Sequence, residues 1–554
     1  MSLDPFSPMT DAGWEFHWDR FRSFPEEHGF RSGAFSAAAS LILLFFLLRA
    51  WRLRPGTLKT SPGPPFPGPS LFWIRFGAIA SGALALAIHV GSLGGVPHTA
   101  DERAYTFQAH LFASGHLASR PRTLPLEASG DLYVVPGPRG LASKYTPGWS
   151  LMLVPGTVLG LPGLTPVLLW IGTILLAHRV FVRRLGATWG GLAALILAAS
   201  PMGILQAASL LAHSGALFLV FLGIDGADRS EQAPLGAAMT LGISTAGLLT
   251  VRPTDALLLA PQLYRLCCSS RRQRMVLAVC IVAGVGLDMA YTRVVFGRMA
   301  LAAHEIADPL YHYGFSPDVG QSPEVYGHNL AGACMNLVVN GLMLNEELWG
   351  WASTSLVFVV IGAWTWIRRR ERIDRDLLLG GALLTLFFCG HFHHGGSHGA
   401  RYYHSLLPLL TLLSVEGLRS LLGEGPITRP VGLTLILCHI VMAGSYLEGR
   451  GRALINYAGV HSSLIGLDTS PRKEILLIGS PPPGTADVYP SLFVHTDPLF
   501  ETGPLTFRLS PLETEANRRG QTLATLVESA YPGWIVTLVR VPGSANPPQI
   551  PGSR

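Results

Sequence analysis

Residues 74–96 read IRFGAIASGALALAIHVGSLGGV, and residues 97–118, which follow directly, read PHTADERAYTFQAHLFASGHLA. The first stretch is apolar over nearly all of its length. About 20 such residues in a helix cross the ~30 Å hydrocarbon core of a bilayer, because each residue adds ~1.5 Å of rise. A helix also satisfies its own backbone polar groups within one segment. The two stretches therefore predict a transmembrane helix that leads straight into a polar loop.

The rest of the chain has a similar character. Hydrophobic residues make up 49% of the 554 residues and charged residues only 14%, with a mean hydropathy of +0.36. This composition is too apolar for a large soluble protein. We predict a mainly α fold, a polytopic bundle of about twelve transmembrane helices. The expected helices cover residues 34–50, 74–96, 164–182, 189–203, 207–223, 235–250, 254–268, 275–296, 348–367, 377–392, 402–421 and 431–447.

The first expected helix, AFSAAASLILLFFLLRA at 34–50, has the features of a retained anchor. A cleaved signal peptide has a basic start and a small-residue cleavage site, whereas this helix has an acidic lead-in and is followed by Arg52 and Arg54. Residues 1–73 thus form a tail, an extra transmembrane helix and a basic cytoplasmic loop.

The net charge of +6 and the pI of about 9.1 arise mainly in short loops between apolar stretches. Lys and Arg in such loops mark the cytoplasmic side, so the charge indicates orientation and not a nucleic-acid partner. The long loops 97–165 and 297–350, and everything after 447, are then extracytoplasmic. The basic groups on the opposite side are Arg52, Arg54, Lys59, Arg75, Arg183, Arg184, Arg271, Arg272, Arg274, Arg368, Arg369, Arg370 and Arg372.

Residues 448–554 are polar and rich in Pro and Gly. Two stretches within them, EILLIG at 474–479 and WIVTLVRV at 534–541, have the composition of strands. We predict a small extracytoplasmic α/β domain. None of the six cysteines lies in it, so disulfides cannot stabilise it.

Asp101 and Glu102 open the polar loop at the start of an amphipathic helix, with Tyr105 and Gln108 at helical spacing from them. Two acids in a first helical turn also interact favourably with the helix dipole, for ~0.3–1 kcal/mol, which is a purely structural role. Further along the loop comes KYTPGW, with Lys144 beside Tyr145. A lysine next to aromatic rings at headgroup depth suits a lipid phosphate, and equally an ordinary interfacial lysine.

Charged groups also occur inside an apolar stretch, at Arg252 and Asp255. A charge at the centre of a membrane helix costs ~2.5–3.5 kcal/mol, so these two side chains should face a polar cavity or each other. His213 lies in another apolar stretch, where a satisfied hydrogen bond in the core is the simpler interpretation.

The turn HFHHGGSH at 391–398 is rich in histidine. Imidazole is a ligand for Zn²⁺ and other divalent cations, but no carboxylate stands at the spacing of a known zinc motif. A metal at His391, His393 and His394 and a polar interfacial turn both remain open. The sequence identifies no certain cofactor.

The order of these features resembles the GT-C class of membrane glycosyltransferases, over most of residues 74–450. The relatives in question are protein O-mannosyltransferases, aminoarabinose transferases of lipid A and lipopolysaccharide-core galacturonosyltransferase-like proteins, with an uncharacterised bacterial branch. Each shared motif is short. The matching stretches are Asp101-Glu102, KYTPGW at 144–149, His213-Ser214, Arg252-Pro253-Thr254, the segment at 308–330 with LNEELWGWAS at 344–353 after it, and GARYY at 399–403.

The resemblance implies a transferase that moves a sugar from a polyprenyl-phosphate donor to a hydroxyl of a lipid, glycan or protein, with inversion, on the extracytoplasmic side of the cytoplasmic membrane. Residues 74–447 would be the catalytic domain. Such chemistry needs a base for the hydroxyl and cations for the departing phosphate. The expected roles are catalytic for Asp101 and Glu102; donor phosphate binding for Lys144, Arg401, Tyr402, Tyr403 and Arg252; and an acceptor or sugar pocket for Tyr105, Gln108, Tyr145 and His398.

Two other functions fit parts of the sequence. A glycolipid transporter or flippase also uses many helices and intramembrane charges, although such proteins commonly contain repeated halves, and none is visible here. A non-catalytic scaffold that presents the C-terminal domain would leave Asp101, Lys144 and Arg401 unexplained. The acceptor, the sugar and the polyprenol do not follow from the sequence.

Overall fold

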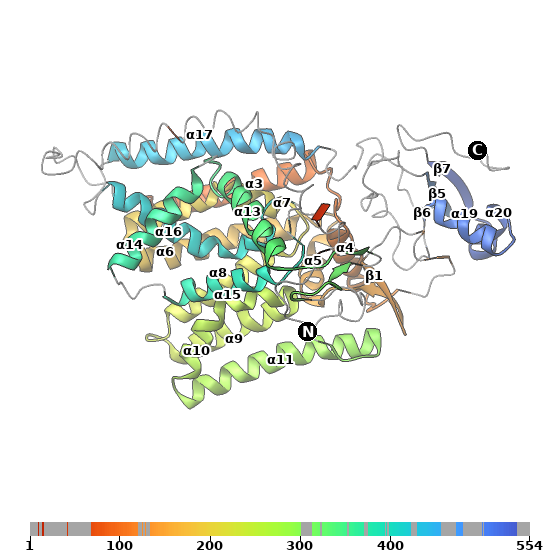
Figure 1. The fold of residues 1–554 in the computed structure, drawn as a ribbon, viewed down its shortest axis with the longest axis horizontal. Helices are drawn as coiled ribbons and strands as arrows, with labels where there is room; N and C mark the ends of the chain where they lie inside the picture. Colours follow the sequence, from red (N-terminus) through yellow and green to blue (C-terminus); the bar gives the residue numbers. More distant parts are fainter. Residues whose placement is uncertain are drawn as a thin grey trace, which may run out of the picture.

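The computed structural model describes residues 68–539, except 120–123, 126–127, 129–132, 301–312, 322–323, 352–353, 370–374, 394, 396–397, 423–428, 456–471, 480–500 and 502, together with Met9, Trp14, Glu15 and Leu41. The predicted helix at 34–50 lies outside these residues, apart from Leu41. The described chain forms a helical bundle with a small α/β unit at one end (Figure 1).

Six helical segments among the described residues are long and apolar enough to cross a membrane. The chain is therefore a multi-pass membrane protein with a mainly α fold, as its composition predicts. The spans are α3 (Leu71–Gly91), α6 (Leu164–Ala198), α9 (Pro234–Val251), α11 (Arg271–Phe296), η3 with α16 (Arg401–Leu422) and α17, whose apolar part is Val431–Ala453. Shorter helices complete the bundle: α7 (Pro201–Ala208), α8 (His213–Asp228), η2 (Pro253–Leu259), α10 (Ala260–Cys267), α14 (Ser355–Arg369) and α15 (Arg375–Cys389).

The predicted helices 164–182 and 189–203 are the two parts of α6, which meet at Gly186, where a φ of 78° and a ψ of 170° are not helical. A Cβ on Gly190 would lie 2.5 Å from the Val182 Cα, whereas residues eight apart in a continuous helix are about 12 Å apart, so the chain turns back at Gly186 and the two helices are separate, as predicted. The second part ends at Ala198, and Ser200 then caps α7 by accepting a hydrogen bond from the Gly203 backbone N–H. The next predicted helix, 207–223, consequently begins later, at His213.

The loop expected at 297–350 contains a helix, α13 (Leu330–Glu347). Two asparagines on its buried face, Asn336 and Asn340, lower its hydropathy and concealed it in the sequence. Asn336 donates hydrogen bonds to the carbonyls of His391 and Phe392, so α13 packs against the histidine-rich turn. The helix predicted at 348–367 begins at Ser355.

Close packing inside the bundle depends on glycine where α14 meets α16. A Cβ on Gly362 would lie 1.9 Å from the Leu413 carbonyl oxygen, and one on Gly417 would lie 2.1 Å from that of Phe358. The two helix backbones therefore approach each other through paired glycines, which is typical of helices packed within a membrane.

The elements around the polar loop gather at the end of the bundle that faces the α/β unit (Figure 1). After α3 come α4 (Ala100–Ala113), the antiparallel hairpin of β1 (Val134–Gly137) and β2 (Gly140–Ser143), and α5 (Pro147–Val158). The bounds of the remaining elements that precede the C-terminal unit are β3 (Gly320–Gln321), β4 (Glu324–Val325), η3 (Arg401–Leu406), α16 (Leu407–Leu422) and α17 (Arg429–Ala453).

The C-terminal unit contains three parallel strands in the order β6-β5-β7. Its elements are β5 (Glu474–Ile478), β6 (Leu505–Arg508), α19 (Leu509–Arg518), α20 (Leu523–Ala530) and β7 (Ile535–Val539), so β5 and β7 fall within the two stretches with strand composition. Leu124 and Ala128 from the first long loop are buried in the same apolar cluster as Ile475 and Phe507. The loop thus contributes core residues to a unit far downstream in the sequence.

Candidate active site

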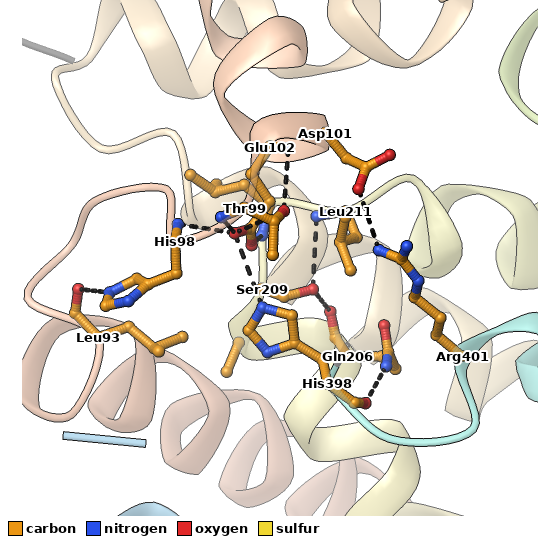
Figure 2. Close-up of polar contacts among 12 residues, drawn as sticks. Leu93, His98, Thr99, Asp101, Glu102, Gln206, Ser209, Leu211, His398 and Arg401 are labelled. Atoms are coloured by element: carbon orange, nitrogen blue, oxygen red, sulfur yellow. Dashed lines mark hydrogen bonds and ion pairs between the residues drawn. The ribbon is translucent and has the colours of Figure 1, made fainter. Parts of the chain in front are cut away.

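The start of α4 is fixed by Glu102. Thr99 and Glu102 form a capping box, in which each side chain accepts a hydrogen bond from the other residue's backbone N–H. The Glu102 carboxylate also accepts from the N–H group of His98 at 2.8 Å (Figure 2) and from that of Leu210 at 2.8 Å. Its side chain is 2% exposed. Glu102 therefore joins α4 to the turn between α7 and α8.

Burial alone would raise the pKa of Glu102. The His398 imidazole and the hydrogen bonds from neighbouring backbone outweigh that effect and hold the pKa well below its usual value. His398 Nε2 lies 3.7 Å from Glu102 Oε2. The carboxylate stays ionised and is occupied by donors from several sides, which suits a structural anchor.

Asp101, one residue earlier, faces a different environment. Arg401 Nη1 lies 3.2 Å from Asp101 Oδ2, across 300 residues of sequence (Figure 2). The Tyr145 hydroxyl donates a hydrogen bond to Asp101 Oδ1. The Asp101 side chain is 21% exposed, against 7% for Arg401, so the carboxylate remains accessible at the edge of the cluster.

Burial alone would also raise the pKa of Asp101. The positive charge of Arg401, the hydrogen bond from Tyr145 and the charge of Lys144 outweigh it and lower the pKa below its ordinary value. Burial and the Asp101 charge together raise the pKa of Tyr145, so its hydroxyl stays protonated and can donate. Asp101 is therefore a carboxylate that a cation, Arg401, and a phenol, Tyr145, hold in its ionised form.

Aromatic rings and two further cations surround this pair. The Tyr105 and Tyr145 rings lie 4.7 Å apart, and the Lys144 ammonium lies 3.4 Å from the centre of the Tyr133 ring. The Tyr402 ring stacks on the Phe388 ring, with 4.8 Å between the ring centres. The guanidinium carbons of Arg401 and Arg252 lie 5.5 and 6.0 Å from the centre of the Tyr402 ring.

Arg252 itself forms an ion pair between α9 and η2. Arg252 Nε lies 3.1 Å from Asp255 Oδ2, which also accepts a hydrogen bond of 2.5 Å from the Ser405 hydroxyl. The pair therefore links η2 to η3. Arg252 Nη1 also lies 3.4 Å from His213 Nε2, so this histidine belongs to the same polar network.

Other residues singled out in the sequence have mainly local contacts. Gln108 donates to the Leu117 carbonyl and accepts from the Ser143 N–H, which ties α4 to β2. Tyr403 is buried, and its ring lies 5.8 Å from that of Phe388. The acceptor role expected of Gln108 and the phosphate role expected of Tyr403 stay predictions.

The histidine-rich turn lies beside Tyr402. The His391 ring stacks on Phe392 and lies 5.3 Å from the Tyr402 ring. Within the described part of the chain, no three His, Cys, Asp or Glu side chains converge in a way that could hold a metal ion. His394, one of the three residues named for that role, lies outside the described residues.

Two residues for which the sequence predicted no role also shape the site. Gln206 donates to the His398 carbonyl at 2.7 Å, and the Glu347 carboxylate accepts from the Ala400 N–H at 3.3 Å. Gln206 belongs to no motif, and Glu347 lies in LNEELWGWAS at 344–353, a stretch quoted for the resemblance without a role for this residue. Their importance follows only from which loop they contact.

No protein-family model matches the chain, and no curated protein sequence matches it. Solved structures do. The chain is similar to ArnT from Cupriavidus metallidurans in the apo state, with 14% identity, 85% of this chain and 93% of that chain covered, and a TM-score of 0.51.

Two further structures are similar at lower scores. They are the same ArnT bound to undecaprenyl phosphate, at 15% identity with 77% and 85% covered and a TM-score of 0.48, and the Archaeoglobus fulgidus oligosaccharyltransferase tethered with an acceptor peptide, at 11% identity with 71% and 56% covered and a TM-score of 0.41. The likeness to apo ArnT shows that the fold is that of the GT-C class.

Proposed function

We propose that this chain is a glycosyltransferase that moves a sugar from a polyprenyl-phosphate donor to a hydroxyl group of a lipid, glycan or protein acceptor. The observation that carries the proposal is the Asp101–Arg401 pair, at 3.2 Å. It brings together the two kinds of group that the reaction needs, a base and a cation. The ArnT protein, whose fold this chain shares, binds undecaprenyl phosphate.

Asp101 is the proposed base. It would take the proton of the acceptor hydroxyl as that oxygen attacks the anomeric carbon and the bond from this carbon to the donor phosphate breaks. Attack from the side opposite the phosphate inverts the anomeric centre. The proton can then pass to the released phosphate monoester, whose second pKa is about 6.

The proposed phosphate clamp consists of Arg401 and Lys144, with Arg252 and Tyr402 behind them. Arg401 has five N–H donors, so it can hold Asp101 and a phosphate oxygen at the same time. Lys144 adds a point charge from the neighbouring loop. Its ammonium lies 5.6 Å from the centre of the Tyr145 ring, whose hydroxyl donates to Asp101. Such preorganised cations stabilise the charge that develops on the leaving oxygen.

The acceptor or donor sugar is proposed to lie on the Tyr105 and Tyr145 side of Asp101, where the rings and the accessible edge of the carboxylate meet. His398 lies next to this region, because its Nε2 is 3.7 Å from the carboxylate of Glu102, the neighbour of Asp101. The loop charges favour an extracytoplasmic site. The resemblance to a bacterial branch of the class favours the cytoplasmic membrane of a bacterial cell envelope.

The test is the lipid and glycan profile of cells that lack this protein. We expect one sugar substituent to be missing, to return with the wild-type chain, and not to return with Asp101→Asn at equal membrane abundance. Restoration by Asp101→Asn would overturn the assignment of the base. Movement of labelled glycolipid across liposomes by the purified chain, without a transfer product, would instead establish transport.

A further inference from the structure

The turn that carries His398 and Arg401 has an unusual backbone. His398 has a φ of 55° and Gly399 a φ of 87°, both in the left-handed region. For a residue other than glycine this region costs on the order of 1 kcal/mol or more. Such a turn persists only when the surrounding structure holds it.

Two side chains hold this turn from opposite sides. Gln206 on α7 donates to the His398 carbonyl at 2.7 Å, and Glu347 on α13 accepts from the Ala400 N–H at 3.3 Å. A Cβ added at Gly399 would lie 1.8 Å from the Glu347 carboxylate oxygen. Only glycine therefore allows the carboxylate to approach the backbone this closely.

Glu347 is itself rigidly placed. It is 1% exposed and is the last residue of α13. The residue after it, Leu348, accepts a hydrogen bond of 2.6 Å from the Ser200 hydroxyl, and the Trp349 indole N–H donates to Ser414 at 2.9 Å. Arg450 of α17 supplies a counter-charge, with its Nη2 at 4.0 Å from the Glu347 carboxylate.

We propose that Glu347 is a positioning residue of the candidate site. Its carboxylate holds the Ala400 N–H, fixes the turn and thereby places Arg401 against Asp101. This inference rests on the proposed function where activity is the readout. The simpler alternative is that Glu347 serves only to neutralise Arg450 between α13 and α17.

The two accounts differ in what they predict for substitutions. Glu347→Gln keeps an oxygen that can accept from the Ala400 N–H but removes the charge, whereas Glu347→Ala removes both. We expect Glu347→Ala to lower kcat by about 100-fold, because displacement by ~1 Å can have that effect. Glu347→Gln should stay within about tenfold of the wild type. Glu346→Gln, one residue earlier on the same helix, is the matched control and should change neither rate nor pH profile.

The pH profile separates positioning from general destabilisation. If the turn moves and Arg401 leaves Asp101, the acid limb of the profile shifts to higher pH. A merely structural role lowers the amplitude without that shift. Equal losses in Glu347→Gln and Glu347→Ala, with the acid limb unmoved in both, would overturn the proposal in favour of charge neutralisation. If Glu347→Ala does not accumulate, Glu347→Asp, one methylene shorter, is measured in its place with the same expectation for the acid limb.

A second measurement does not depend on the proposed reaction. Asp101→Cys and Arg401→Cys are introduced together in the full chain in membranes, and the rate of cross-linking by a short bis-methanethiosulfonate is compared with and without Glu347→Ala. We expect at least a tenfold slower reaction with Glu347→Ala and no change with Glu346→Gln. Equal rates in all backgrounds overturn the positioning role. A slower rate with Glu347→Ala supports it, and if the wild-type chain then shows no transferase activity, only the proposed function is rejected.

Discussion

Substituting the two adjacent acids separately should give opposite results for stability and for activity. The Glu102 carboxylate accepts from the backbone N–H groups of His98, Thr99 and Leu210 at 2.8, 3.0 and 2.8 Å. Glu102→Gln replaces it by an amide with only one acceptor oxygen. Whichever way the amide turns, at least one buried N–H faces an NH₂ group instead of an oxygen.

The magnitude follows from the number of donors left without an acceptor. One unsatisfied buried N–H costs ~1–3 kcal/mol, a large share of a total stability of ~5–15 kcal/mol. Asp101→Asn should cost ~1 kcal/mol or less, because the side chain is 21% exposed and the amide oxygen can still accept from Arg401. For activity the order reverses, since loss of a general base lowers the rate ~10²–10⁴-fold.

The assay combines thermal unfolding of the purified chain, followed by tryptophan fluorescence, with the amount of product that each variant restores to cells lacking the protein. We expect Glu102→Gln to unfold at lower temperature and to retain activity in proportion to its folded fraction. Asp101→Asn should unfold like the wild type and be inactive. A stable but inactive Glu102→Gln beside an active Asp101→Asn would refute this reasoning and make Glu102 the base.

Three further predictions concern the surroundings of the pair. Arg401→Met should move the acid limb of the pH–rate profile to higher pH. Burial raises the pKa of Asp101 and Arg401 is the largest influence that lowers it, so the wild type stays active below the ordinary carboxyl range. An unmoved acid limb would contradict this. Tyr145→Phe should shift the limb in the same direction but by less, because only one hydrogen bond to Asp101 is lost; a shift to lower pH in the same titration would count against it. Leu124→Asp places a charge in the apolar cluster around Phe507 and should speed limited proteolysis of the C-terminal unit, with an unchanged digestion pattern as the contrary result.

The fold could be anticipated where sequence and membrane physics coincide. The stretches at 74–96 and 275–296 are apolar over most of their length, and α3 and α11 overlap them closely. Hydropathy does not reveal a buried helix that is partly polar. It predicts a loop where α13 lies because Asn336 and Asn340 interrupt the apolar face of that helix, although both amides lie buried in the bundle. Hydropathy records the residue type and not the partner that satisfies it.

The candidate site was anticipated by chemical type and not by geometry. Asp101 and Arg401 stood out as charges beside membrane segments, yet nothing in the sequence indicates that residues 300 positions apart form an ion pair. Adjacent positions were equally hard to separate. Asp101 and Glu102 look alike in a first helical turn, and only the Leu210 N–H, which is 108 positions away, shows that Glu102 is committed to the backbone.

The contacts of Asp101 bear on the order of events in the proposed reaction. A carboxylate that holds Arg401 and Tyr145 is strongly stabilised in its ionised form, and such a group is a weak base. A donor phosphate that arrives at Lys144 and Arg401 competes for the same guanidinium, which weakens its interaction with Asp101. The proton affinity of Asp101 must then rise, because a negative charge has been brought close and a positive one is shared. Deprotonation of the acceptor is thereby favoured only after the donor is bound, so the ion pair that holds the empty site together also couples donor binding to activation of the base.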